Sequence, residues 1–198
     1  SEELTVGETK VISIRDGKGE VKDENGKNPT PYRPAKPKLA LKSASDYGDK
    51  PLTGLLTEFV KGWEFYNFDP AMMRGGTVFS RISIRRRSGA LPEEPELDEE
   101  GASLKDILSY WSESDKERFE SLNQAFEDCT QRRIKHFVHD GAHQIFLDEG
   151  FQNPLALQKA SDGTMRLLAY QVLLTQSDLP PLIAIEEPER NLHPRAIR

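Results

Sequence analysis

The stretch SDGTMRLLAYQVLLTQSDLPPLIAIEEPERNLHP, residues 161–194, sets an apolar helix and an apolar strand ahead of two adjacent glutamates. Two carboxylates at close range repel each other, so placing both at the end of a buried strand costs free energy. A divalent cation together with a nucleotide phosphate would offset that repulsion. The stretch therefore predicts an α/β fold with a ligand site where the strand ends.

The helix in this stretch begins at a capping residue. Ser161 is placed to cap the first turn, and Gly163 would let the backbone approach an anion closely. A helix N-terminus carries unpaired N–H groups and a partial positive charge, which suit a phosphate. The alternative is a purely structural cap, which is common. The apolar face of the helix consists of Met165, Leu168, Ala169, Val172 and Leu173.

The strand is the continuous apolar run of residues 182–185, a pattern typical of a strand buried on both faces of a mostly parallel sheet. Glu186 and Glu187 follow at its carboxyl end, where open α/β sheets bind their ligands. Successive strand residues face opposite ways, so one carboxylate can hold a metal while the other reaches a water. The alternative is a plain exit from the strand with two solvated acids.

The order SDGTMR, helix, PLIAIEEPERNLHP resembles the segment from the signature motif to the Walker B strand of ABC-type ATPases, which are P-loop NTPases. It is most similar to the branch that contains structural-maintenance-of-chromosomes (SMC) and RecF-like proteins, and there to bacterial predicted ATPases with SDG and EEPE. The resemblance covers residues 161–194 and, more weakly, residues 101–108. It implies an ABC-type head with a mixed sheet and a helical insert.

In such a head, Ser161, Asp162 and Gly163 would form the signature loop, which contacts the γ-phosphate of ATP bound to a second copy of the chain. The implied partner is therefore the same chain in a head-to-tail homodimer. Many ABC ATPases have Gly where Asp162 stands and Asp where Glu186 stands. The branch with SDG and EEPE has both residues, so we interpret them as markers of that branch.

The residues after the strand would complete the site. By the resemblance, Glu186 would support Mg²⁺ through a water, and Glu187 would be the catalytic residue that orients or activates the attacking water. Asn191, Leu192 and His193 would form the D-loop, which crosses the dimer interface beside the partner's site. Phosphoryl transfer needs charge neutralisation and a positioned nucleophile, so ATP and Mg²⁺ are the expected cofactors.

The phosphate-binding loop of a P-loop NTPase, GxxxxGK followed by Ser or Thr, does not occur in the sequence. The family also places a switch histidine on a strand beyond Walker B, and the sequence ends before such a strand. We therefore expect the chain to be the middle and later part of a larger ATPase. By itself it should neither bind nor hydrolyse ATP well.

The remaining sequence predicts three parts. Residues 1–50 form an antiparallel β hairpin, with its turn at Asp16 and Gly17, and a proline-rich connection. Residues 51–135 form a helical insert or arm. Residues 136–198 carry the signature helix and the Walker B strand of the ATPase core.

Local signals predict the elements of the insert. A helix over residues 52–62 should bury an apolar side, and the aromatic segment WEFYNFDP should anchor a core. Two capping boxes, beginning at Ser103 and Ser114, introduce two further helices. Two strands should follow, joined at Asp140 and Gly141. The apolar side of the first helix consists of Leu55, Leu56, Phe59 and Val60.

Three histidines follow these helices, and the sequence favours ordinary strand and turn residues over a metal site. On a strand, His136 and His139 point to opposite faces, and a turn intervenes before His143. No second group of ligands accompanies them, because Cys129 is the only cysteine. We interpret Cys129 as a small apolar filler on a helix.

Composition limits the classes of function. The 198 residues carry a net charge of −6, and no apolar run approaches the ~18 residues that span a membrane. A single cysteine and the lack of a signal segment favour a cytoplasmic protein without a membrane partner. The net negative charge argues against binding of nucleic acid by bulk electrostatics. The run Arg85–Arg87, followed by an acidic run, is more typical of a solvated loop.

The leading hypothesis is an ATP-hydrolysing ABC-type head that acts as a dimer. One alternative is a non-catalytic module that senses nucleotide or docks a partner. Another is a DNA-binding subunit associated with DNA repair or phage defence, in which case DNA or an operon-encoded effector is a further partner.

Overall fold

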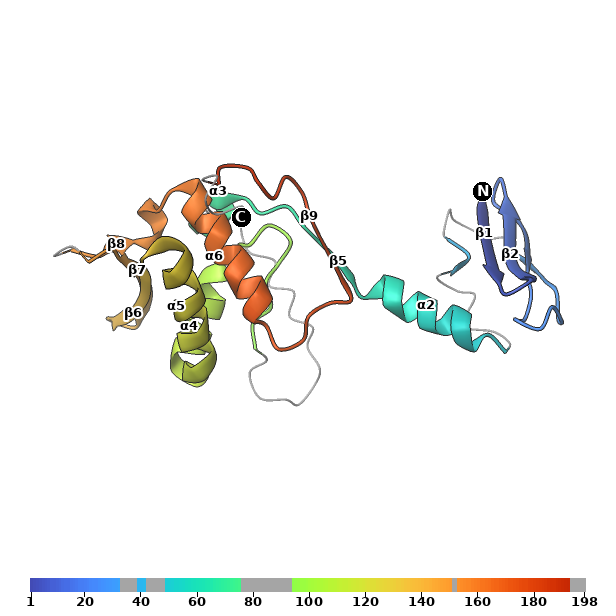
Figure 1. Ribbon diagram of the computed structural model, residues 1–198, viewed down its shortest axis with the longest axis horizontal. Coiled ribbons are helices and arrows are strands. Elements are labelled where there is room, and N and C mark those ends of the chain that lie inside the picture. Colours follow the sequence, from blue (N-terminus) through green and yellow to red (C-terminus); the bar gives the residue numbers. More distant parts are fainter. Residues whose placement is uncertain (33–38, 42–48, 76–93, 151–152, 193–198) are drawn as a thin grey trace. The chain divides into compact units, whose positions relative to one another are not determined.

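The computed structural model describes residues 1–32, 39–41, 49–75, 94–150 and 153–192. Helices and sheets occur together, which confirms the predicted mixed α/β fold class (Figure 1). Contacts along the chain define two compact units, residues 1–63 and residues 64–198. The division into the three functional parts predicted from the sequence remains a prediction.

The first unit contains a four-stranded antiparallel sheet in the order β1-β2-β3-β4. Asp16 and Gly17 have φ angles of 51° and 74°, which a two-residue hairpin turn of the primed type requires, so the predicted hairpin is confirmed. Buried Val11, Ile12 and Ile14 belong to the core of this unit. The strands are β1 (Glu2–Val6), β2 (Thr9–Arg15), β3 (Lys18–Val21) and β4 (Thr30–Tyr32).

The helix predicted over residues 52–62 is α2 (Pro51–Lys61), but its predicted apolar side is wrong. Leu55 and Phe59 are exposed, whereas Thr53 and Thr57 are buried. The threonine side faces the rest of the first unit, since the Thr57 hydroxyl lies 3.1 Å from the Leu41 carbonyl and the Thr53 N–H donates to Glu24 at 2.6 Å. These contacts with distant residues accompany the burial of Thr53 and Thr57.

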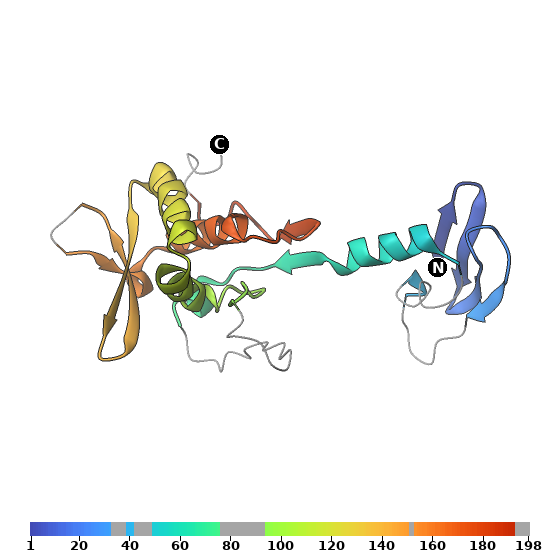
Figure 2. The same ribbon diagram turned by 90° about the horizontal axis from the view of Figure 1, so that it is seen from below.

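The second unit is built around three helices and a three-stranded sheet. Figures 1 and 2 show α4, α5 and α6 packed together, with the β6–β7 hairpin beside α4 and α5. The helices are α4 (Leu104–Ser114), α5 (Lys116–Thr130) and α6 (Asp162–Thr175), and the antiparallel sheet contains β6 (Arg133–His139), β7 (Ala142–Asp148) and β8 (Leu155–Ala156). The shorter elements are β5 (Trp63–Tyr66), α3 (Pro70–Met73), η1 (Leu157–Lys159) and β9 (Leu182–Ile185).

The core of the second unit lies among these helices and the sheet. Trp111 of α4 and Phe126 of α5 are completely buried. Tyr66 and Phe68 are also buried, so the aromatic segment after α2 anchors this core as predicted. Helix α6 buries most of its length, which agrees with its predicted apolar face. Burial of these aromatic and aliphatic side chains is the main favourable term that holds the helices against the sheet.

The helix starts differ in how well the sequence predicted them. Ser161 caps α6 as expected, because its side chain accepts a hydrogen bond from Thr164 N–H. The capping box at Ser103 is wrong: the Ser103 hydroxyl donates to the Glu96 carbonyl at 2.8 Å instead. The second box is wrong by one residue, since Asp115 rather than Ser114 caps α5.

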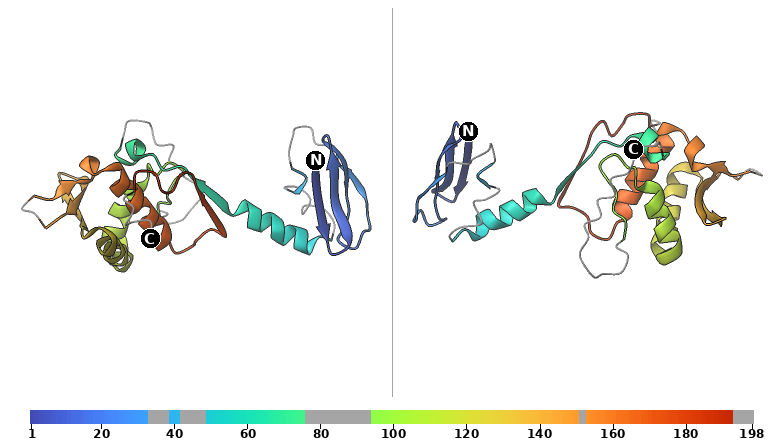
Figure 3. Two further views of the ribbon diagram at one scale, coloured as in Figure 1. Left: turned by 45° about the horizontal axis from the view of Figure 1, so that its top comes forward. Right: turned by 180° about the vertical axis from the view of Figure 1, so that it is seen from behind.

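Strand β9 is more exposed than its apolar sequence predicted. All four of its residues are half-buried, so the expectation of a strand buried on both faces is wrong. Within the described ranges β9 pairs with β5 in a two-stranded sheet, and Figure 3 shows the chain returning from α6 to lie beside β5. A two-stranded sheet leaves a strand less covered than the inside of a larger sheet would.

The β6–β7 hairpin corrects the interpretation of the histidines. Asp140 and Gly141, with φ angles of 50° and 74°, form the predicted two-residue turn. Val138 therefore pairs with His143. Because His136 and Val138 share a face of β6, His143 lies on the same face as His136. The expectation that the turn separates these two histidines is wrong.

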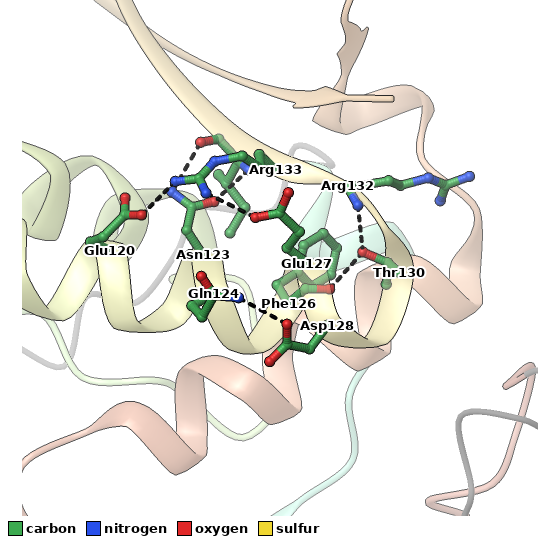
Figure 4. A network of polar contacts seen from close by, with 10 residues as sticks. Glu120, Asn123, Gln124, Phe126, Glu127, Asp128, Thr130, Arg132 and Arg133 are labelled. Carbon is green, nitrogen blue, oxygen red and sulfur yellow. Dashed lines mark hydrogen bonds and ion pairs between the residues drawn. The ribbon is translucent and has the colours of Figure 1, made fainter. Parts of the chain in front are cut away.

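A buried amide joins α5 to the start of β6 (Figure 4). The Asn123 side chain accepts from the Ile134 N–H at 2.6 Å and donates to the Ile134 carbonyl at 3.2 Å. It thereby replaces the strand partner that Ile134 lacks on that side. Beside it, Arg133 bridges Glu120 at 2.6 Å and Glu127 at 2.8 Å. The hairpin is thus fixed to the helices at the residue where it begins.

Two further expectations concern Cys129 and the arginine run at residues 85–87. Cys129 does lie on helix α5, but it is exposed, so its interpretation as an apolar filler is wrong. The Arg85–Arg87 run lies outside the described residues. In the described ranges, no helix combines the length and the apolar character needed to cross a bilayer.

Candidate functional site

The site predicted from the sequence is made of the first turn of α6 and the loop after β9, and we call residues 161–163 and 186–192 together the signature region. Ser161 begins it by capping α6. Its hydroxyl accepts from the Thr164 N–H at 3.2 Å and lies 2.9 Å from the Thr164 hydroxyl. One donor of the first turn is therefore satisfied within the protein, which fixes where the helix begins.

Gly163 brings the two halves of the signature region together. A Cβ atom on Gly163 would lie 2.1 Å from the Asn191 carbonyl oxygen and 3.7 Å from the Leu192 Cα. Real Cβ atoms do not approach a backbone oxygen this closely, so a glycine is required there. From the sequence, we expected Gly163 to let the backbone approach an anion closely. The structure shows that it admits the loop after β9, so this loop and the start of α6 share one surface.

Arginines from outside the quoted stretch flank the first turn of α6. Arg74, the residue after α3, pairs with the Asp162 carboxylate at 2.5 Å and donates to the Ala160 carbonyl at 2.8 Å. Arg132 donates to the Thr164 hydroxyl at 3.1 Å. Asp162 balances the charge of Arg74, and Glu149, 2.7 Å from Arg132, balances that of Arg132. The helix dipole is therefore the term that favours an anion at this end of α6.

Sequence reasoning missed Arg74 and Arg132. Arg74 lies 88 positions before its partner Asp162, and Arg132 lies 32 positions before Thr164. Neither arginine belongs to a recognisable motif, so the sequence carries no local signal for their positions.

The two glutamates after β9 are exposed. The Glu186 N–H donates to the Tyr66 carbonyl at 2.9 Å, which continues the pairing of β9 with β5. Glu187 has a φ angle of 46°, a left-handed conformation that is uncommon for a residue with a side chain. Its carboxylate pairs with Arg190 at 3.0 Å. The chain therefore turns sharply at the second glutamate, and its charge is partly balanced.

A tyrosine holds the loop after β9 against α6. The Tyr170 hydroxyl donates to the Pro188 carbonyl at 2.9 Å, and burial raises the pKa of Tyr170. One turn earlier, Arg166 is only 4% exposed. Among the described residues, its Nε and Nη1 atoms have no hydrogen-bond partner. A buried guanidinium with unpaired donors is costly in a folded protein.

The donor set fits magnesium and phosphate in part. Glu186 and Glu187 offer the hard carboxylate oxygens that Mg²⁺ prefers, and both are accessible. The free nitrogen atoms of Arg166 are donors of the kind that phosphate accepts. A loop that wraps the phosphates does not occur in the sequence. Of the predicted D-loop residues, Asn191 and Leu192 are described, and His193 lies outside the described residues.

A cavity of about 150 Å³ elsewhere in the second unit does not suit a nucleotide. Acidic residues line it, including Glu64, Glu94 and Glu96, and they would repel phosphate. Burial and then a hydrogen bond to Glu64 raise the pKa of Tyr66 at its wall. The signature region is therefore the better candidate for an anionic ligand.

The second unit is a mixed α/β structure with adjacent carboxylates after β9 and a helix start capped by Ser161, which is consistent with a nucleotide-binding P-loop NTPase. The comparison with known families is specific. Residues 22–198 match the family described as "AAA domain, putative AbiEii toxin, Type IV TA system", and the chain belongs to this family. No curated protein and no solved structure matches the chain.

Proposed function

We propose that this chain belongs to an ATP-hydrolysing head of the ABC type, in the SMC- and RecF-like branch, and supplies its signature loop, Walker B carboxylates and D-loop. One observation carries the proposal: the first turn of α6 interlocks with the loop after β9, where Gly163 leaves no room for a Cβ beside Asn191. In ABC-type dimers the signature loop and the D-loop face the same partner. Their close approach in this chain supports that arrangement.

Each side chain then has a role that its position supports. Glu186 would support Mg²⁺, which when bound neutralises charge on the phosphates. Glu187, at the sharp turn after β9, would orient the attacking water. Ser161 holds the helix start, and Arg74 holds Asp162 in place by the ion pair at 2.5 Å. The proposed catalytic carboxylate and the proposed signature loop would thus both come from one chain.

The nucleotide would lie between two copies of the chain. The sequence has no phosphate-binding loop, so the residues of this chain would supply the signature and Walker B sides of the site and not the phosphate cradle. The signature loop of one copy would contact the γ-phosphate held by the other. A homodimer is thus part of the proposal, and DNA or an operon-encoded effector is a further candidate partner.

The test is steady-state ATP hydrolysis by the intact protein with Mg²⁺, wild type against Glu187→Gln, with dimerisation followed in the same samples. Removing the group that positions the water should reduce kcat by about 10²–10⁴-fold. The variant should accumulate an ATP-bound dimer, because binding is retained. Glu189→Gln is the matched control: Glu189 is exposed in the same loop, and the change should leave hydrolysis within about twofold.

Two outcomes would overturn the proposal. If Glu187→Gln and Glu189→Gln reduce kcat equally, the loop tolerates no change at either position. Glu187 then has no special role. If neither wild type nor variant hydrolyses ATP or dimerises with it, the EEPE segment is a scaffold. The non-catalytic docking module would then replace the ATPase as the best account of the chain.

A further inference from the structure

A cluster of three potential ligands lies away from the signature region. Glu113 belongs to the last turn of α4, His136 to β6 and His143 to β7. One ligand atom from each lies within 4.8 Å of the other two. We name these three residues the histidine cluster. The ATPase proposed above does not use them.

The distances in the histidine cluster are close to those of a tetrahedral metal site. His136 Nε2 lies 3.0 Å from His143 Nδ1, and His143 Nδ1 lies 3.3 Å from a Glu113 carboxylate oxygen. In a tetrahedral zinc site with bonds of about 2.0–2.1 Å, neighbouring ligand atoms are about 3.3 Å apart. Two of the three separations thus lie near the tetrahedral value and the third lies within 4.8 Å, so small side-chain rotations would bring the three ligand atoms around one cation.

Hydrogen bonds around His136 favour the tautomer that binds a metal. The Ser112 hydroxyl lies 2.8 Å from the Ser109 carbonyl, to which it can donate its one proton. With that proton directed at Ser109, the contact of 2.7 Å between Ser112 Oγ and His136 Nδ1 is donated by the Nδ1–H. The Nε2 atom then carries the lone pair. A histidine ligand typically donates its other N–H to such a neighbour.

His143 and Glu113 occupy the outer side of the cluster. Without a metal, the His143 Nδ1–H faces both the His136 Nε2 lone pair and the Glu113 carboxylate. A cation would take the place of this proton, which can move to Nε2 because the His143 side chain is 41% exposed. Glu113 is 49% exposed, so water can reach the fourth position.

We propose that Glu113, His136 and His143 form a binding site for a divalent transition metal, with zinc as the best match. Two imidazole nitrogens and one carboxylate oxygen, with a fourth position open to water, are a common zinc ligand set. The site joins α4 to both strands of the β6–β7 hairpin. Binding would therefore stabilise the folded chain by mass action.

Burial and the charge of His143 lower the pKa of His136, a direction that favours the unprotonated form a metal ligand needs. Lys105 acts in the same direction on the pKa but disfavours a cation, whereas Glu113 favours one. Glu113 belongs to the histidine cluster, so its negative charge would lie next to the cation. Lys105 does not belong to the cluster. The balance supports binding of a cation.

The test is a zinc titration of the full chain in competition with a chromophoric chelator, repeated with Co²⁺ to read the absorption bands of a tetrahedral site. We expect one Zn²⁺ per chain. His136→Ala and His143→Ala should each weaken binding more than about 10-fold, and Ser112→Ala should weaken it by about 10-fold through the lost hydrogen bond. Zinc should also raise the melting temperature of the wild type.

His139→Ala is the matched control, because His139 lies on the same hairpin with its side chain 78% exposed and outside the cluster. It should bind zinc as the wild type does. Equal weakening by His139→Ala, no saturable binding in the micromolar range, or a cobalt spectrum without tetrahedral bands would overturn the proposal. Melting curves in EDTA identify a variant that fails to fold, and Glu113→Gln, at a half-exposed position, then supplies the decisive comparison.

Discussion

The signature region and the histidine cluster belong to the same unit, but they are assembled in different ways. The signature region comes from one continuous stretch of 34 residues, and its motifs are visible in the order of the letters. The histidine cluster takes one residue from each of three elements. The first is specified by local sequence, and the second exists only because a helix and a hairpin meet.

The same difference separates the supporting residues. Ser161 caps α6 through a bond to a residue three positions away. Asp162, in contrast, is held by Arg74 from 88 positions away, and His136 is oriented by Ser112 from another element. Local hydrogen bonds can be read from spacing, whereas distant partners depend on how the elements pack. Variants in the signature region and around the histidine cluster should therefore distinguish local hydrogen bonds from contacts between distant segments.

The largest effect should come from Asn123→Ala, which releases the hairpin from α5. The N–H and the carbonyl of Ile134 would both lose their buried partner, at a cost of about 2–4 kcal/mol in the free energy of unfolding. Urea unfolding measures this cost. Because β6 carries His136, zinc affinity should fall as well.

Gln124→Ala is the control for that variant. Gln124 lies next to Asn123 on α5, but its amide reaches only an exposed bond to Asp128. The free energy of unfolding should change by less than about 0.5 kcal/mol. Equal effects of the two substitutions would show that the buried amide does not hold the strand.

Gly163→Ala tests the interlock of the signature region. The new Cβ would meet the Asn191 carbonyl at 2.1 Å, and a backbone oxygen cannot move aside as a flexible side chain does. We expect a loss of about 1–3 kcal/mol, although alanine favours a free helix by about 1 kcal/mol over glycine. Urea unfolding again gives the value.

Leu174→Ala serves as the control on the same helix, because Leu174 is 62% exposed. Its effect should stay within about 0.5 kcal/mol. A gain in stability for Gly163→Ala would mean that the loop after β9 does not dock on α6, and the proposed function would lose its main support.

The smallest effect should be a pH dependence that originates in the histidine cluster. Burial and the charge of His143 lower the pKa of His136 from its usual 6.5, so the unfolded chain binds a proton more readily than the folded one. The contribution to stability should be complete above pH 6.5 and should be lost as the pH falls through 6.5 toward the lower folded pKa. The measurement is urea unfolding in EDTA between pH 5 and pH 8.

His136→Gln should flatten this dependence, because the residue that titrates is gone. His139→Gln, at the exposed position on the same hairpin, should leave the slope unchanged. Two results would contradict this prediction: no loss of stability below pH 6.5 in the wild type, or a flattened curve in both variants. Either would mean that burial beside His143 does not lower the pKa of His136.

Much of the fold was predictable from short-range patterns. The turns at Asp16 and Asp140, the helices α4 and α5 and the cap at Ser161 all follow from neighbouring residues. The capping box at Ser103 failed because the hydroxyl found the Glu96 carbonyl, seven positions away and outside the helix. The predicted apolar side of α2 is wrong because the helix turns its threonines, and not its leucines, toward Leu41 and Glu24, which lie far away in the sequence.

The histidines show what a stricter use of the same rules could have found. A two-residue turn at Asp140 and Gly141 aligns Val138 with His143, and alternation then places His136 on that face. The sequence therefore contained the register of the pair. It contained no sign that Glu113 would approach from α4, since no spacing links a helix end to a hairpin.

By itself, the sequence determined the α/β class, the hairpin turns, the cap at Ser161 and the helix and strand that follow it. These features depend on residues within a few positions of one another, where backbone geometry fixes which side chains meet. Only the tertiary structure decided that Arg74 pairs with Asp162 and that the Asn191 carbonyl occupies the space beside Gly163. It also decided that Glu113 completes the histidine cluster. Those contacts join distant segments, and their positions follow from the packing of the whole core.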